Sequence, residues 1–130
     1  MRNKLFLLTG FIVCLTTIIL FSSCEKNKSG VVTYYGNVVD KSNGNPISAA
    51  EVSISFDFGE SSVITGSDGS YELPVYIPGG FEKNRQPVII KVTRYNYFSE
   101  YKHIAEEGEF KKDLIGQKIQ VSFTLDRRKY

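Results

Sequence analysis

The sequence has 130 residues, enough for one domain of ordinary size. Its net charge of +2 comes from the N-terminus: of 16 Lys and Arg residues, Arg2 and Lys4 lie there, and the other 14 balance 14 Asp and Glu residues. This balance leaves no concentrated basic face for nucleic acid. A single histidine cannot supply the usual ligands of a zinc peptidase, and the sequence has no Gly-x-Ser-x-Gly elbow for a serine triad, in which His103 would have to serve alone.

The first 23 residues have the pattern of a secretory signal peptide. Arg2 and Lys4 form a short basic head, residues 5–21 are uncharged and largely apolar, and two small serines follow. The apolar run is shorter than the roughly 20 residues that a membrane-spanning helix needs. We therefore expect residues 1–23 to be removed on export, and a permanent anchor helix is the alternative.

The tetrapeptide Phe21-Ser22-Ser23-Cys24 resembles the bacterial lipobox, in which small residues precede a cysteine that becomes the acylated N-terminus. Phe21 departs from the usual leucine, whereas the two serines agree. The chemistry needs a thiolate that takes up a diacylglyceryl group, and small neighbours so that a peptidase can reach the bond. The resemblance implies a lipoprotein with palmitate-type chains on Cys24 and the lipid bilayer as its partner. The alternative is an inert thiol in an ordinary signal sequence.

Acylation of Cys24 would leave the exported chain without a free thiol, because the other cysteine, Cys14, lies in the apolar run. A domain without disulfides depends on core packing alone. Residues 24–30 form a polar linker that spans only about 20 Å, so the domain over residues 31–130 stays close to the membrane. We expect a lipid-anchored protein of the cell envelope, at the outer membrane, on its periplasmic face or at the surface.

From residue 31 onward the apolar residues recur with the period of two that is typical of half-buried strands. The clearest case is the segment 50–58, in which apolar residues alternate with polar ones. The segment 88–93 is a β-branched run that predicts a central strand. In chain order, the predicted strands are 32–39, 50–58, 62–65, 70–75, 88–93, 97–102 and 119–125.

Turn-forming sequences separate these strands. Asn43-Gly44 and Asp68-Gly69 tolerate positive φ angles at low steric cost, and a longer loop opens at Pro78. No helical period persists for more than two turns, and residues 103–112 are the least β-like. Six or seven short strands with turns about every 8–12 residues predict an all-β fold, an antiparallel β-sandwich.

Two segments resemble carboxypeptidase regulatory-like domains. The first joins Tyr35–Asp40, Gly44–Ile47 and Ala50–Ile54, which match a Gly-x-Val-x-Asp strand, a Gly-x-Pro-Ile turn and an Ala-x-Val strand. The second, Thr65–Leu73, matches the Asp-Gly-x-Tyr-x-Leu hairpin of the same family. The resemblance spans about residues 33–125. It implies a transthyretin-like, Ig-like sandwich of seven antiparallel strands.

The resemblance gives fold-making roles to the motif residues. Gly36 would let the facing sheet approach closely, and Pro46 would start the second strand at an edge where no ladder donor is needed. Asp68-Gly69 would close a hairpin. Asn96 departs from the family, which commonly has glycine before the following tyrosine. Such domains are usually accessory parts of peptidases or outer-membrane transporters, or they stand alone on lipoproteins.

A cluster of tyrosines is the best candidate for a binding face. Tyr95 and Tyr97 share one side of an extended strand, and Tyr101 joins them if the strand continues. Such a row could bind sugar rings or a partner protein, and cross-strand packing is the alternative. The loop over residues 78–86 is a second candidate, because loops at the ends of sandwiches often carry binding residues.

The other polar residues suggest no reaction. His103 has no ligand or base partner in the sequence, and Arg127–Lys129 has the composition of a solvated tail. The sequence therefore predicts no catalytic residue, no metal and no cofactor. The expected function is a non-enzymatic lipoprotein module with a structural or protein-interaction role in the envelope. The alternative is a carbohydrate- or peptide-binding accessory protein of an outer-membrane uptake system, with an envelope protein or a glycan as its partner.

Overall fold

The computed structural model describes residues 29–57, 59–110 and 112–129. The predicted signal peptide, Cys24 and most of the linker lie outside the described residues. Within them, no helix is long and apolar enough to cross a membrane. The strands are β1 (Gly30–Asp40), β2 (Glu51–Phe56), β3 (Gly59–Ile64), β4 (Ser70–Ile77), β5 (Val88–Thr93), β6 (Glu100–Ala105), β7 (Lys118–Gln120) and β8 (Phe123–Leu125), with a short 3₁₀ helix, η2 (Lys112–Leu114), before β7.

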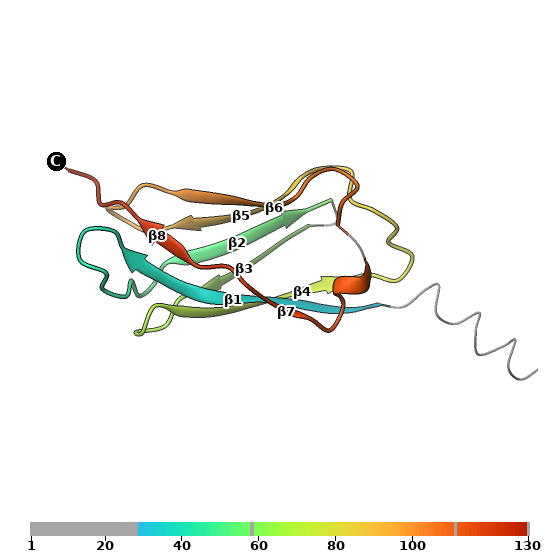
Figure 1. Ribbon diagram of the computed structural model, residues 1–130, viewed down its shortest axis with the longest axis horizontal. Helices are drawn as coiled ribbons and strands as arrows, with labels where there is room; N and C mark the ends of the chain where they lie inside the picture. Colours follow the sequence, from blue (N-terminus) through green and yellow to red (C-terminus); the bar gives the residue numbers. More distant parts are fainter. Residues whose placement is uncertain (1–28, 58, 111, 130) are drawn as a thin grey trace, which may run out of the picture.

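These strands form two sheets that pack face to face (Figure 1). In one sheet β1 is central, with β4 on one side and both β7 and β8 on the other. The other sheet has the order β3-β2-β5-β6, and all its pairs are antiparallel. The predicted all-β, sandwich-like fold is therefore confirmed.

The edge formed by β7 and β8 differs from the prediction. Both strands run parallel to β1, so the sandwich is not purely antiparallel. The segment 119–125, predicted as one strand, is divided at Val121 and Ser122, and the described residues hold eight strands, so a count of seven is not confirmed. A parallel partner needs a long crossover rather than a hairpin, and the alternating pattern of a strand does not reveal its direction.

Gly36 explains how this divided edge fits against β1. A Cβ at this position would lie 2.2 Å from the carbonyl oxygen of Val121 and 2.9 Å from Oγ of Ser122. The close approach is thus to the neighbouring edge of the same sheet, and the expectation that Gly36 accommodates the facing sheet is wrong. Tyr71 Oη donates a hydrogen bond to the same Val121 carbonyl, and Val121 N donates to Tyr35 O at 2.8 Å.

The core lies between the sheets and is filled by alternate residues of the strands. Val32, Tyr34 and Val38 of β1 are fully buried, and the carboxyl-terminal Phe123 and Leu125 complete this layer. The Tyr34 hydroxyl has no hydrogen-bond partner among the described residues, and burial raises the pKa of Tyr34 to about 12. Strand periodicity alone therefore located most of the core correctly.

The two motif segments pack directly against each other. Gly69 has a φ of 75°, and a Cβ there would lie 2.7 Å from Val38 O and 2.9 Å from the Pro46 Cβ. Val38 N donates to Gly69 O at 2.8 Å. Pro46 forms an isolated bridge with Val39, and β2 begins only at Glu51, so the expectation that Pro46 starts the second strand is wrong.

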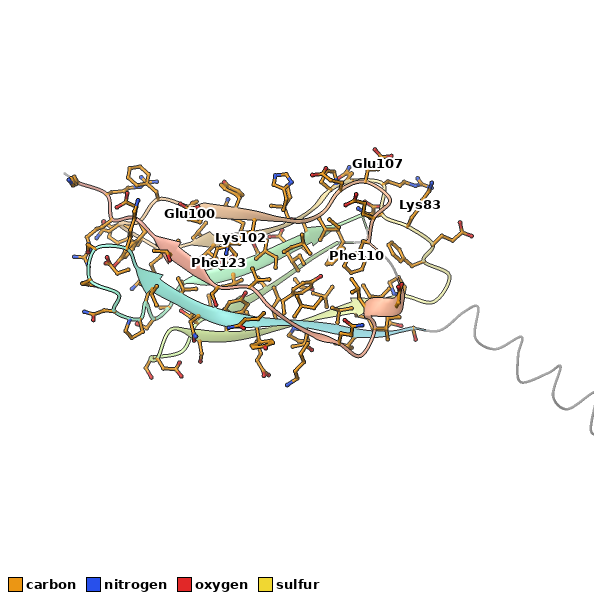
Figure 2. The ribbon with its side chains drawn as sticks, in the orientation of Figure 1. Lys83, Glu100, Lys102, Glu107, Phe110 and Phe123 are labelled. Atoms are coloured by element: carbon orange, nitrogen blue, oxygen red, sulfur yellow. The ribbon has the colours of Figure 1, made fainter. Side chains whose placement is uncertain are left out.

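The two ends of the sandwich differ in how they are covered. At the end where β1 begins, Phe110 is 1% exposed and meets Phe56 edge to face, with ring centroids 5.2 Å apart. Asn84 is also buried there: its amide nitrogen donates to Glu106 O at 2.9 Å, and its amide oxygen accepts from Phe110 N at 3.0 Å. Figure 2 shows Phe110 at this end, which we call the closed end.

Candidate functional site

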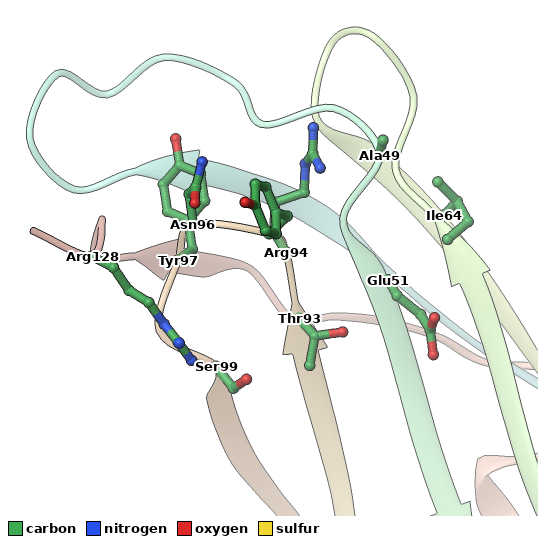
Figure 3. A pocket seen from close by; sticks show the side chains of 10 residues that line it. Ala49, Glu51, Ile64, Thr93, Arg94, Asn96, Tyr97, Ser99 and Arg128 are labelled. Carbon is green, nitrogen blue, oxygen red and sulfur yellow. The ribbon is translucent and has the colours of Figure 1, made fainter. Parts of the chain in front are cut away.

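An open cleft of about 410 Å³ lies at the opposite end, where β1 and β5 finish and β2 begins (Figure 3). We call it the end cleft. Its walls come from two loops, from the adjoining ends of β2, β3 and β5, and from the C-terminal segment, so residues far apart in the chain meet there. The lining residues are Ala49, Glu51, Ile64, Thr93, Arg94, Tyr95, Asn96, Tyr97, Ser99 and Arg128.

Two of these residues have left-handed backbones. Ala49 has a φ of 56° and Asn96 a φ of 67°, and among the described residues no other non-glycine residue has a positive φ. Asn96 is the third residue of a turn closed by Tyr97 N and Arg94 O at 3.1 Å, a place that favours Gly or Asn. This geometry accounts for the asparagine at position 96, because a side chain other than that of Gly or Asn is disfavoured at this place in the turn. Alanine has no side chain that stabilises this conformation locally, so the left-handed backbone of Ala49 costs about 1–2 kcal/mol.

Strained residues of this kind persist only where the surrounding structure holds them. Ala49 N donates to Thr65 O at 3.1 Å, and the next residue, Ala50, donates to the buried Thr65 hydroxyl at 3.0 Å. Thr65 in turn donates from its hydroxyl to Ile47 O at 2.8 Å. Non-glycine residues in left-handed conformations gather at binding and active sites. Their position at one cleft marks it as the candidate site.

A buried carboxylate, that of Asp40, orients one of the lining side chains of the end cleft, Tyr97. Asp40, at the end of β1, is 2% exposed, and its Oδ2 accepts hydrogen bonds from Tyr97 Oη at 2.8 Å and from Arg127 Nη2 at 3.2 Å. Its Oδ1 accepts from the hydroxyl and the backbone of Ser42. The Ser42 hydroxyl, followed by Tyr97, lowers the pKa of Asp40 to about 2. The Tyr97 ring is therefore held in place by an ionised partner.

The C-terminal segment forms one wall of the cleft. Tyr97 and Arg127 form an antiparallel bridge, and Arg128 N donates to Asn96 O at 2.8 Å. Because side chains alternate across an extended segment, Arg127 faces Asp40, whereas Arg128 lines the cleft and stacks on Phe98 at 5.4 Å. Residues 127–129 are exposed, as a solvated tail would be, but both arginines also make specific contacts with the fold.

The three predicted tyrosines do not form one row. Tyr95 and Tyr97 line the end cleft, and Tyr95 is 79% exposed. Tyr101 lies on β6 and lines a separate hollow on the outer face of the sheet, beside Ser53 and Ser55. The turn at Asn96 ends the extended segment, and β6 starts only at Glu100. Whether any of the three tyrosines binds a ligand stays a prediction.

The other sequence candidates lie away from the end cleft. The loop over residues 78–86 belongs to the closed end, where Asn84 is committed to internal hydrogen bonds. His103 is exposed on β6, and its Nδ1 lies 3.8 Å from a Glu106 carboxylate oxygen. Sequence reasoning missed Arg94, Arg128 and Ala49. Arg94 could have been suspected because it directly follows the strand at residues 88–93, but nothing in the sequence indicated the pairing of the C-terminus.

Comparisons with known proteins identify the fold. No family profile matches the sequence, and no curated protein matches it significantly. Among solved structures, 3-chlorocatechol 1,2-dioxygenase from Rhodococcus opacus 1CP superposes over 80% of this chain with a TM-score of 0.53 and 11% identity. Catechol 1,2-dioxygenase from Acinetobacter sp. ADP1 superposes over 77% of the chain with a TM-score of 0.53 and 14% identity.

A third neighbour is the dioxygenase domain of a dioxygenase–carbohydrate-binding fusion from Streptomyces sp. SirexAA-E, with 16% identity and a TM-score of 0.53 over 78% of this chain. The chain spans 83% of that domain, but only 62% of the Rhodococcus enzyme and 53% of the Acinetobacter enzyme. At these identities the similarity defines a fold: the chain has the β-sandwich found in catechol dioxygenases.

These neighbours correct the functional prediction. We expected a non-enzymatic structural or interaction module, with a carbohydrate- or peptide-binding accessory protein as the alternative. The three neighbours described above are dioxygenases or a dioxygenase domain, so neither the inference of a non-enzymatic module nor that of an accessory protein stands. The error arose because a sandwich without recognisable motifs was interpreted as a scaffold, whereas a fold by itself does not determine function.

The residues that the structure describes do not fit a metal centre built from histidine, cysteine and carboxylate ligands. Oxygen chemistry in enzymes is commonly carried by haem, flavin, copper or non-haem iron, and protein-bound iron typically takes histidine and carboxylate ligands. Within the described residues, no group of three or more His, Cys, Asp or Glu side chains could hold a metal ion. The single histidine, His103, lies outside the end cleft. We therefore derive no reaction step through a metal.

Proposed function

We propose that the end cleft binds a small aromatic diol of the catechol type. The observation that carries this proposal is the cleft itself, whose rim holds both non-glycine left-handed residues, Ala49 and Asn96, and whose wall presents Tyr95 and Tyr97. A cavity of about 150 Å³ is enough for benzene, so a cleft of about 410 Å³ accommodates one substituted ring. The fold shared with catechol dioxygenases supports the choice of ligand class.

The chemistry of the lining suits such a ligand. Tyr95 offers an exposed aromatic face for stacking, and Thr93 and Ser99 supply hydroxyl groups at the lower rim in Figure 3. Tyr97 is oriented by its hydrogen bond to Asp40, so its ring loses little freedom when a ligand binds. A few convergent polar groups around aromatic side chains are typical of small-molecule sites.

The experiment titrates the purified full chain with catechol and, as a matched ligand, with cyclohexane-1,2-diol, which has the hydroxyls without the aromatic ring. We expect saturable heat of binding for catechol only. Tyr95→Ala should weaken binding, because it removes the stacking face while disturbing no buried contact. Tyr101→Ala, another exposed tyrosine but outside the cleft, serves as the control and should bind as the wild type does. Absence of saturable catechol binding, or equal loss in both variants, contradicts the proposal.

We also propose that the chain is a lipoprotein held at an envelope membrane, with the outer membrane favoured, by acylation of Cys24. The described chain begins beside Gly30, at the end of β1 opposite the end cleft (Figure 1). β1 has 11 residues, so its ends lie about 36 Å apart at about 3.3 Å per residue. An anchor at Cys24 would therefore present the cleft away from the bilayer. Mass spectrometry of the natively expressed protein tests this, and an unacylated mature N-terminus contradicts it.

The relationship to carboxypeptidase regulatory-like domains is likewise a proposal. Counting β7 and β8 as one interrupted strand would reduce the number of strands to the seven expected for a transthyretin-like sandwich. The contact between Gly69, Val38 and Pro46 supports this relationship, because it joins the two segments that carry the resemblance. Replacing Gly69 with alanine should destabilise the fold sharply, since φ is positive and the added Cβ would meet the backbone oxygen of Val38 and the rigid ring of Pro46.

A further inference from the structure

The outer face of the β3-β2-β5-β6 sheet carries a second hollow, of about 460 Å³. Side chains alternate across a strand, and Val52 and Ile54 of β2 are fully buried in the core, so Ser53 and Ser55 face outward. These two serines are small, whereas the strands on either side of β2 carry longer side chains. We call this site the outer hollow, and its lining residues are Ser53, Ser55, Glu60, Gln86, Pro87, Ile89, Lys91 and Tyr101.

Ser53 supplies a buried hydroxyl group at the floor of the outer hollow. The residue is only 7% exposed although it points away from the core, and its hydroxyl makes no hydrogen bond with any described residue. The buried hydroxyl of Thr65, in contrast, accepts from Ala50 N at 3.0 Å and donates to Ile47 O at 2.8 Å. A buried hydroxyl without a partner is costly, so native structures rarely leave one unsatisfied. The Ser53 hydroxyl therefore marks the floor of the hollow as a place for a polar ligand atom.

Two opposite charges flank this floor. Glu60 on β3 lies opposite Ser55 in the strand register, and Lys91 on β5 lies opposite Ser53. The Cα atoms of the two charged residues are thus two strands and two residues apart, a separation of about 12 Å. Within the described part of the chain neither side chain forms an ion pair, and Lys91 Nζ lies 5.5 Å from the centroid of the Tyr101 ring. The carboxylate and the ammonium group therefore line the same hollow without neutralising each other.

The other sheet carries the same two types of charged residue in a different arrangement. There Lys118 Nζ lies 3.5 Å from Glu72 Oε1, so the two charges neutralise each other. In the outer hollow the serine hydroxyls lie between the two charged residues instead. A ligand that carries both a carboxylate and an ammonium group would complement Lys91 and Glu60 at once, whereas a singly charged ligand would leave one of them without a partner. The charges of the hollow thus favour a small zwitterion.

One wall of the outer hollow is apolar. Ile89 lies on the same face of β5 as Lys91, and Pro87 continues this wall just before β5 begins. A short aliphatic side chain can pack there while the charged groups of the same molecule reach Lys91 and Glu60. A cavity of about 150 Å³ is enough for benzene, so about 460 Å³ accommodates one such molecule. A free α-amino acid combines the two charges and the aliphatic group at this scale.

We propose that the outer hollow binds a free α-amino acid with an aliphatic side chain. Lys91 binds the carboxylate and Glu60 binds the ammonium group, and the Ser53 hydroxyl donates a hydrogen bond to the carboxylate. The aliphatic side chain packs against Ile89 and Pro87. This site is separate from the end cleft, so the proposal does not depend on the binding of catechol-type rings there.

The test is calorimetric titration of the full chain with L-leucine and with two analogues that each lack one of its charged groups. One analogue is 4-methylpentanoate, which lacks the ammonium group, and the other is 3-methylbutylamine, which lacks the carboxylate. We expect saturable binding of leucine and about tenfold weaker binding of each analogue, because each loses one charge-assisted contact. If leucine does not bind, or if either analogue binds as tightly as leucine, the proposal is overturned.

Substitutions in the hollow assign the role of each charge. Glu60→Gln should weaken leucine binding about tenfold and leave the affinity for 4-methylpentanoate unchanged, whereas Lys91→Gln should weaken leucine binding and leave the affinity for 3-methylbutylamine unchanged. Ser53→Ala should weaken leucine and 4-methylpentanoate alike. The matched controls, Glu72→Gln and Lys118→Gln, make the same changes on the other sheet and should bind leucine as the wild type does. Equal losses in the controls would overturn the assignment of the site to the outer hollow.

Discussion

The closed end and the end cleft are both made of loops that join the two sheets, but they treat polar groups in opposite ways. At the closed end the buried side-chain amide of Asn84 makes hydrogen bonds with the backbones of Gln86, Glu106 and Phe110. The Phe110 side chain is itself buried in the core. At the end cleft Arg94 and Arg128 have donors that no described residue accepts. Polar groups that are fully paired stabilise a fold, whereas oriented but unpaired ones are available to a ligand.

The backbone shows the same contrast. At the closed end the residues with positive φ are glycines, such as Gly80 at 83° and Gly108 at 78°, for which this conformation carries no steric cost. At the cleft end Ala49 and Asn96 adopt it with side chains. Strain is therefore confined to the end that carries the candidate site. Three substitutions test whether the two ends differ as this comparison implies.

The largest effect is expected at the closed end. Phe110→Ala should lower the free energy of unfolding by about 3–5 kcal/mol, because it empties a fully buried site that contacts Phe56 and Phe81. Urea denaturation followed by circular dichroism measures this loss. Phe98→Ala is the control at the cleft end, where the phenylalanine is 52% exposed, and it should cost less than about 1 kcal/mol. Similar losses in the two variants would remove the distinction between the ends.

The sequence predicted the features that depend on neighbouring residues and missed those that depend on residues far apart in the chain. Period-two patterns are local, so β5 was predicted at its observed bounds and the buried positions of β1 and β8 were found. In contrast, the direction of a strand and the place where it is interrupted are set by contacts with residues far away in the chain. The parallel edge of β7 and β8 depends on the contact of Gly36 with Val121, 85 positions away in the chain (121 − 36), and no local pattern reports it.

The candidate site was predicted only in part for the same reason. Tyr95 and Tyr97 were singled out because they are close together in the chain, and they do line one cleft. Arg128 reaches that cleft because its backbone nitrogen pairs with Asn96, a contact between the C-terminus and a turn that adjacent residue types do not encode. Tyr101 was included because a continuous strand was assumed, whereas Asn96 turns the chain.

An intermediate effect is expected from Asp40, the ionised group that accepts a hydrogen bond from the cleft residue Tyr97. Because hydrogen bonds from Ser42 and then Tyr97 lower its pKa from 3.8 to about 2, the unfolded chain binds this proton more readily than the folded one. The stability it contributes is therefore present above about pH 4 and is lost as the pH falls toward 2. Asp40→Asn should lower the urea midpoint at pH 7, by less than Phe110→Ala does, and flatten the acid limb of the stability profile.

Asp68 provides the control for this profile. Its pKa is also lowered, by the hydroxyl and the backbone of Ser70, but it is exposed in a hairpin and bonds to no other element. Asp68→Asn should therefore change the acid limb less, and it should leave ligand binding at the cleft unaltered. An acid limb in Asp40→Asn that is as steep as in the wild type would show that ionised Asp40 does not contribute to the stability of the fold.

The smallest expected effect is a gain in stability, and because most substitutions lower stability, its sign identifies a strained backbone. Ala49→Gly relieves a left-handed alanine, a gain of about 1–2 kcal/mol, but adds freedom to the unfolded chain that costs about 0.5–1 kcal/mol. The variant should therefore be more stable by about 0.5–1 kcal/mol in thermal unfolding. Ala50→Gly, at the neighbouring buried position, has no strain to relieve and should lose stability. Destabilisation by both substitutions would mean that Ala49 is not strained, and the backbone contrast between the two ends would disappear.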